Sequence, residues 1–184
     1  MTEINLNYIL AFSYPAVRKG ESCPLLWDLR DPPSTAAQLV SSTQKHKFTS
    51  FKLLQSQYAT TPPVSMLHIS CDVLPNQWRI IARNKQGVTV HDVLEAIHSV
   101  VRAPLTVQEW EDLSPKQQDR IKRVFDVRWR GAVIPEKERK EGVKRVDCLL
   151  QVCPSLLTLP SANTSTFPLV LSICRTIYVV RQRV

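Results

Sequence analysis

The sequence predicts an α+β fold, in which a small antiparallel sheet is covered by two or three helices in a single domain. Its length of 184 residues and its hydrophobic content of 43% suit a globular protein with one core. Segments with the period-two alternation of strands come first, and segments with the 3.6-residue period of helices follow. This order of strands and then helices is typical of α+β proteins.

Residues 24–83 carry the strand patterns. In PLLWDLR, which begins at Pro24, an extended backbone places Leu25, Trp27 and Leu29 on one face. Residues 33–50 are rich in Ser, Thr and Lys and are interpreted as a loop. A strand is expected over residues 48–58. The alternating segments SMLHISCDV and WRIIAR predict a hairpin over residues 65–83.

Helical periodicity begins after Thr89. The stripe of Val93, Leu94, Ile97, Val100 and Val101 predicts an amphipathic helix that ends before Pro104. A short second helix is expected after Thr106, because Glu109 three residues later completes a capping box.

A third helix is expected from Ser114 as N-cap and Pro115 as first residue to about Trp129. The charged segment VIPEKERKEGVK, residues 133–144, is interpreted as a surface loop. The next segment, RVDCLLQV, is interpreted as a strand or a short helix.

The boundaries of the domain follow from composition. Residues 1–20 are expected to form an arm, residues 21–154 the α+β domain, and residues 155–184 an atypical apolar segment with candidate strands at 169–174 and 177–180. No run approaches the roughly 20 apolar residues of a membrane span, and no signal-peptide pattern is evident. The five cysteines lack close pairing, which indicates reduced thiols. We therefore expect a cytoplasmic or nuclear protein without a membrane partner.

Charged residues within the apolar patterns predict a structural ion cluster. Arg128 lies on the apolar side of the third helix, where a buried guanidinium requires a carboxylate. Asp28 and Arg30 alternate with the apolar residues of the first strand, and Arg145 and Asp147 have the same spacing. We expect these five charges to clasp each other and to select one register of the fold. The alternative is that Asp28 and Arg30 form a recognition pair.

The net charge of +8 is concentrated in one part of the chain. Residues 116–145 contain 11 Lys/Arg and 5 Asp/Glu, a net charge of +6. Lys116, Arg120, Arg123 and Arg130 form a basic stripe on the third helix, and we expect them to be the binding residues if the protein has an acidic partner. The alternative is an ordinary solvated helix face. No nucleic-acid-binding motif accompanies the stripe, so a nucleic-acid partner stays an open alternative.

Catalytic and metal-binding patterns are weak. His91, Glu95 and His98 fall at helical spacing and could bind zinc, but Arg102 projects from the same face and opposes a cation, so neither a metal nor a cofactor is expected. For an enzyme, the candidate catalytic residues are Asp28, His91, His98 and Cys148. The cysteines lie in apolar patterns typical of structural thiols, and no nucleophile elbow or glycine-rich phosphate loop is present.

Several of these segments, in this order, resemble a family of domains of unknown function that is abundant in mushroom-forming fungi. The resembling residues span about 24–150 and are WDLRDPP at 27–33, QWRI at 77–80, GVTVHDVLEAI at 87–97, Thr106, Glu109-Trp110, Arg128, and KRVDCL at 144–149. The resemblance implies a compact α+β domain and assigns no reaction. The family usually has an aromatic residue in place of Cys148, often one in place of His98, and a different tail after about residue 154.

These observations favour a non-catalytic binding or interaction module with a basic helical face. A protein or another acidic molecule is the expected partner, and the apolar C-terminal segment makes a homodimer an additional expectation. The alternative is a small enzyme with a pocket between sheet and helices. The reaction of such an enzyme is not indicated by any motif.

Overall fold

The structure is a computed structural model that describes residues 4–11, 25–40, 48–50, 55–71, 74–75, 78–149, 171–172 and 177–180. The chain divides into two compact units, which are considered separately. One contains Met1–Val100 and Val170–Val184, and the other contains Val101–Leu169. The combination of antiparallel sheets and helices confirms the predicted α+β class. Most of the predicted arm and of the predicted C-terminal segment lies outside the described residues.

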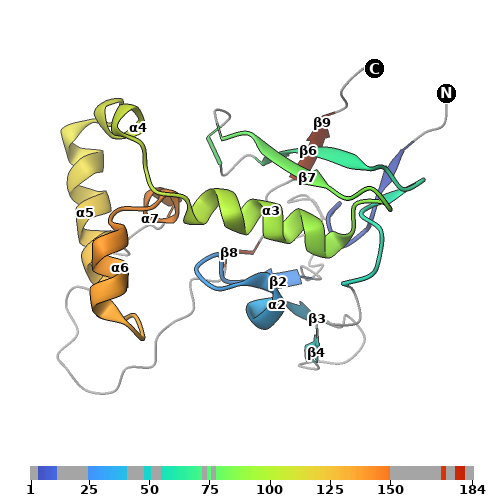
Figure 1. Ribbon diagram of the computed structural model, residues 1–184, viewed down its shortest axis with the longest axis horizontal. Coiled ribbons are helices and arrows are strands. Elements are labelled where there is room, and N and C mark those ends of the chain that lie inside the picture. Colours follow the sequence, from blue (N-terminus) through green and yellow to red (C-terminus); the bar gives the residue numbers. More distant parts are fainter. Residues whose placement is uncertain are drawn as a thin grey trace, which may run out of the picture. The chain divides into compact units, whose positions relative to one another are not determined.

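The first unit contains three antiparallel sheets (Figure 1). The four-stranded sheet has the order β4 (Phe48–Ser50), β3 (Gln38–Val40), β2 (Leu25–Trp27) and β8 (Leu171–Ser172). The three-stranded sheet has the order β7 (Ile80–Arg83), β6 (Met66–Cys71) and β9 (Ile177–Val180). The third sheet pairs β1 (Asn5–Leu6) with β5 (Thr60–Thr61). Strands from the C-terminal segment thus join two sheets whose other strands lie in the first half of the chain.

The hairpin of β6 and β7 confirms the predicted hairpin and pairs the apolar residues of its two strands. Leu67 is paired with Ala82, and Ile69 with Ile80. Cross-strand partners share one face of a sheet, and all four of these side chains are buried. The apolar face of the hairpin is therefore its core face.

Helix α3 (Val90–Arg102) confirms the first predicted helix. Its first turn is held by Thr89 and Asp92, because the Asp92 carboxylate accepts from the Thr89 backbone N–H at 2.9 Å and the Thr89 hydroxyl accepts from the Asp92 N–H at 3.2 Å. Its apolar stripe is buried as predicted, with the exception of the half-buried Val100. The buried members of the helix are Val90, Val93, Leu94, Ile97 and Val101.

The second unit contains the helices that follow α3 in the chain (Figure 1). Helices α4 (Val107–Glu111) and α5 (Pro115–Arg130) confirm the next two predictions, and both begin with a complete capping box, on Thr106 and Ser114 respectively. The chain continues through α6 (Pro135–Glu141) and α7 (Arg145–Leu149). On α5, Ile121 and Val124 are buried. None of the helices in the described ranges is long and apolar enough to cross a membrane.

Three local predictions are wrong. The segment interpreted as a charged loop contains α6, whose charged side chains form ion pairs that local sequence does not reveal. The segment 33–50, interpreted as a loop, contains α2 (Pro33–Ala36) and strands β3 and β4. The strand expected to extend to Tyr58 covers Phe48–Ser50, and Gln55 and Ser56 form a turn. Short elements of three or four residues carry too little periodicity to be recognised.

Candidate functional site

The segment of β2 buries the apolar face that its sequence alternation predicts. Leu25 and Trp27 are each 1% exposed, and Leu29, just beyond β2, is 4% exposed. The Trp27 indole N–H donates to the Asp31 carbonyl at 2.9 Å, which satisfies its polar atom inside the core. This segment is therefore first a packing element.

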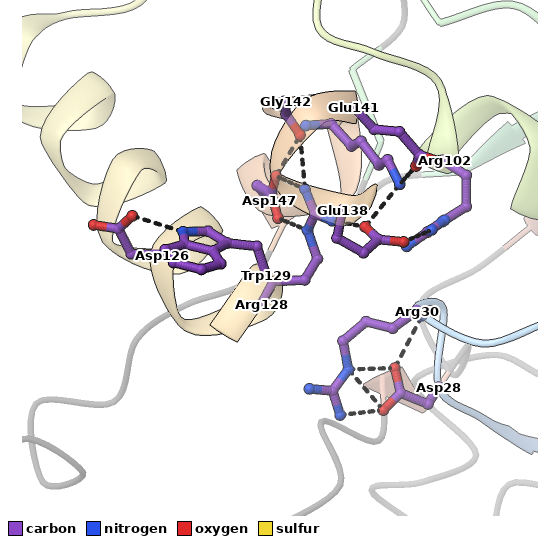
Figure 2. Close-up of polar contacts among 11 residues, drawn as sticks. Asp28, Arg30, Arg102, Asp126, Arg128, Trp129, Glu138, Glu141, Gly142 and Asp147 are labelled. Carbon is purple, nitrogen blue, oxygen red and sulfur yellow. Dashed lines mark hydrogen bonds and ion pairs between the residues drawn. The ribbon is translucent and has the colours of Figure 1, made fainter. Parts of the chain in front are cut away.

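Asp28 and Arg30 form an ion pair with each other (Figure 2). The Arg30 Nε donates to both carboxylate oxygens at 3.0 Å, and its Nη2 donates to Oδ2 at 2.5 Å. The Arg30 backbone N–H also donates to Asp28 Oδ1 at 3.0 Å. The hydrogen bond to Asp28 raises the pKa of Arg30 above its ordinary value. The pair thus fastens the turn that follows β2.

Arg128 and Asp147 form a second, buried pair in the second unit. Arg128 Nε donates to Asp147 Oδ1 at 2.7 Å, and Nη2 donates to Oδ2 at 2.9 Å, so the contact is bidentate. The side chains are 6% and 0% exposed respectively. Arg128 also donates to the Gly142 carbonyl at 2.9 Å and to Glu138. A buried guanidinium on the apolar side of α5 is thereby fully paired (Figure 2).

Glu138 connects this pair to two further cations. Arg102 donates to Glu138 Oε1 at 2.8 Å, and Lys144 Nζ donates to Oε2 at 2.9 Å. Burial disfavours the charged carboxylate, but the hydrogen bonds from Lys144 and Arg102 outweigh it and lower the pKa of Glu138 to about 2. Lys144 Nζ also contacts Glu141 at 2.5 Å. We call this group the charge cluster; its members are Arg102, Arg128, Lys144, Glu138, Glu141 and Asp147.

The charge cluster balances three cations against three anions. Charged groups that satisfy each other in this way hold secondary structure elements in one arrangement. The cluster joins α5, α6 and α7 and the end of α3. Its chemistry is therefore that of a structural network.

The five residues predicted to form one ion cluster have the following partners. The structure brings together Arg128 and Asp147, and it brings together Asp28 and Arg30. Arg145 donates to Glu109 at 3.0 Å. A single cluster of all five stays a prediction, because Asp28 and Arg30 belong to the first unit and the other three to the second.

The basic stripe of Lys116, Arg120, Arg123 and Arg130 is exposed on α5. None of these four forms a salt bridge with another residue in the described part of the chain. Arg130 and Arg139 both stack on Trp129, each with its guanidinium carbon 5.3 Å from the ring centroid. The stripe therefore presents positive charge to solvent.

The histidines of α3 differ in their surroundings. His91 Nε2 lies 4.0 Å from Glu95 Oε1, whereas the His98 ring packs against Trp27 with centroids 6.1 Å apart. His98 is thus half-buried against the core, and His91 is half-buried beside Glu95. Among the described residues, no three His, Cys, Asp or Glu side chains are placed to hold a metal ion.

Cys148 lies on α7 as a half-buried free thiol. Burial, followed by the negative charges of Asp147 and Glu109, raises its pKa to about 11. Thiolate is the nucleophilic form of cysteine. A nucleophilic role at neutral pH is therefore disfavoured for this residue.

Comparison with known proteins identifies a family. Residues 25–153 match the model of DUF6699, a family of unknown function, and this match covers more than half of the chain. The chain belongs to the DUF6699 family. No curated protein and no solved structure matches it.

Membership in DUF6699 assigns no activity, so the described residues must suggest one. The matched region contains the basic stripe, both ion pairs and the whole charge cluster. Sequence reasoning overlooked Glu138, Glu141 and Lys144 within this DUF6699 region. Their alternation in EKERKEGVK, with opposite charges three or four residues apart, was a helix signal that could have identified them.

Proposed function

We propose that this protein is a non-catalytic binding module that contacts an acidic protein through the basic stripe on α5. The observation that carries the proposal is the contrast between its two sets of cations. Every cation of the charge cluster is paired, whereas the four cations of the stripe are exposed without a salt bridge among the described residues. Unpaired surface charge of one sign attracts and orients a partner of the opposite sign.

The surroundings of the stripe favour a protein over a nucleic acid. Asp119 and Asp126 are exposed on the same helix and would repel phosphates along one side of the stripe. Val127, which is 70% exposed, lies between Arg123 and Arg130 and adds apolar surface. Interfaces that mix apolar contacts with both signs of charge are typical of protein partners.

The test is equilibrium binding of the full chain to fluorescently labelled poly-L-glutamate at increasing salt. We expect binding that weakens as salt rises, because solvent-exposed charges are screened. The variant Arg120→Ala/Arg123→Ala should bind about tenfold more weakly, since each exposed pair contributes up to about 1 kcal/mol. The matched control is Arg79→Ala/Arg83→Ala, which removes the same charge from exposed positions in the first unit.

Two outcomes would contradict the proposal. One is the absence of binding at low salt, and the other is an equal loss in both double variants. A duplex DNA probe is measured in parallel. Stronger binding to DNA than to poly-L-glutamate would support the nucleic-acid alternative instead.

The enzyme alternative has less support from the described residues. Asp28 is engaged by Arg30, His98 packs on Trp27, and the thiol of Cys148 has a raised pKa. An open hollow of about 440 Å³ lies along α6. Its lining consists of Ile134, Glu136, Lys137, Lys140 and Glu141, and so includes none of the candidate catalytic residues.

The remaining expectations extend this proposal. The resemblance implies a fungal source, and the cysteine pattern supports a cytoplasmic or nuclear location. Imaging of the tagged full chain tests the location. Light scattering of the purified chain tests homodimerisation, and a mass of one chain at all concentrations would rule it out.

A further inference from the structure

The exposed face of α5 has the spacing of a helix-packing seam. Lys116, Arg120, Arg123, Val127 and Arg130 follow one another at intervals of four, three, four and three residues. All five are exposed. Side chains three and four residues apart lie on one line along a helix, and a second helix can lie along such a line when its side chains are complementary. On α5 this line is occupied by four cations and one valine.

The chemistry along the seam differs between its centre and one flank. At 100° per residue, Asp119 and Asp126 lie on the same side of the seam, seven residues apart. Lys122 lies beyond them and contacts Asp119 at 3.8 Å. A partner would therefore meet positive charge along the centre and negative charge along one edge. This pattern specifies both the charge and the orientation of what binds.

We propose that the partner presents an acidic amphipathic helix that packs along α5. Its carboxylates, also at four-three spacing, face the cations of the seam, an apolar side chain packs on Val127, and a basic side chain faces Asp119 or Asp126. The proposal rests on the proposed function, and it adds the shape of the partner and the spacing of its side chains.

Other occupants fit this face less well. A second copy of this chain would bring a basic seam against a basic seam, which is unfavourable. Duplex DNA would place its charged phosphate backbone against the apolar side chain of Val127. The seam runs from Lys116 to Arg130, a distance of 14 residue steps, which corresponds to about 21 Å of helix axis. A partner helix of about 15 residues would cover it.

The experiment compares two synthetic peptides of identical composition, bound to the full chain in calorimetric titrations at low salt. The matched peptide places glutamates at four-three-four-three spacing with a leucine at the fourth seam position and lysines on one flank. The permuted peptide distributes the same residues around the helix. Circular dichroism establishes equal helicity in both. We expect the matched peptide to bind at least about tenfold more tightly.

Three variants identify the contacts. Arg120→Ala/Arg123→Ala should weaken binding of both peptides. Val127→Ser should weaken binding of the matched peptide selectively, whereas Val107→Ser, at a valine that is 74% exposed on α4, should change neither affinity. Selective loss in Val127→Ser supports packing along the seam.

The outcomes separate this inference from the proposed function. If the two peptides bind with equal affinity and Arg120→Ala/Arg123→Ala weakens both, the proposal of a helical partner is overturned. The proposal of an acidic partner then still stands. Binding of neither peptide overturns both proposals. Stronger binding of a short duplex DNA than of either peptide also overturns both.

Discussion

Asp147 shows how one buried carboxylate can hold several segments together. It is completely buried, and it accepts from the Arg128 Nε and Nη2 and from the Lys144 backbone N–H. Removing it would leave the buried Arg128 without its bidentate partner. We predict that Asp147→Ala lowers the free energy of unfolding by about 3–5 kcal/mol, as expected when one member of a buried ion pair is lost.

Chemical denaturation measures this change, and Asp119→Ala is the matched control. Asp119 and Lys122 form an exposed pair with side chains that are 63% and 60% exposed. Exposed pairs contribute about 0–1 kcal/mol. If Asp147→Ala lowers the free energy of unfolding no more than Asp119→Ala does, the buried pair stabilises the fold no more than an exposed pair.

Glu138 makes the stability of the protein depend on pH. Because its pKa is lowered from 4.5 to about 2 in the folded state, it stabilises the fold fully above pH 4.5. That contribution is lost progressively as the pH falls from 4.5 towards 2. We predict that the difference in stability between the native chain and Glu138→Gln narrows over this range. Urea denaturation at several pH values measures it, and a difference that is independent of pH would contradict the assignment.

At the residue scale, the sequence predicted the need of Arg128 for a carboxylate but not the identity of all its partners. An arginine on the apolar side of a helix is visible from periodicity alone. The role of Glu138 as a partner of Arg128 is not visible from periodicity, because the two residues meet only when α6 packs on α5. A local sequence pattern contains no information about such contacts.

At the scale of elements, the start of α5 depends on the Ser114 capping box. The Ser114 hydroxyl accepts from the Gln117 backbone N–H at 3.4 Å, and the Gln117 side chain accepts from the Ser114 N–H at 2.9 Å. We predict that Ser114→Ala destabilises the protein by about 1 kcal/mol. Thermal unfolding measures the effect.

Ser99→Ala is the matched control for this prediction. Ser99 is exposed within α3, away from the helix start, so its removal should be neutral or slightly stabilising. Equal destabilisation in both variants would mean that the effect does not arise from capping.

The helices that were predicted carry several sequence signals, whereas α6 carries only weaker ones, namely Pro135 in its first turn and alternating charges. Helices α3, α4 and α5 combine apolar periodicity or a capping box with a proline or threonine start. Helix α6 has neither a side-chain cap nor a buried residue. Its ion pairs with Arg128 and Lys144 stabilise it instead, and these come from outside its own segment.

At the scale of the whole molecule, sheets depend on segments far apart in the sequence. The central strand β6 is paired with β9, with Ile69 opposite Val179 and Cys71 opposite Ile177. Alternation indicated that both segments are strands, but pairing is a property of two segments and cannot be read from either one. The same is true of β2 and β8.

We predict that deletion of residues 155–184 accelerates amide exchange in β6, because the strand loses its hydrogen-bonded neighbour β9. Hydrogen–deuterium exchange of the segment Met66–Cys71 measures this, with α5 as the internal reference. Deletion of residues 181–184 is the control, since it leaves β9 in place. Unchanged protection of β6 in the longer deletion would contradict the pairing.

The pairing of β6 with β9 also constrains when the protein can fold during its synthesis. About 100 residues are translated between the two strands, so β6 is synthesised long before its partner β9. The second unit, by contrast, is continuous in sequence. The helices can therefore assemble as soon as their own segment has been translated, whereas β6 keeps one open edge until β9 has been translated.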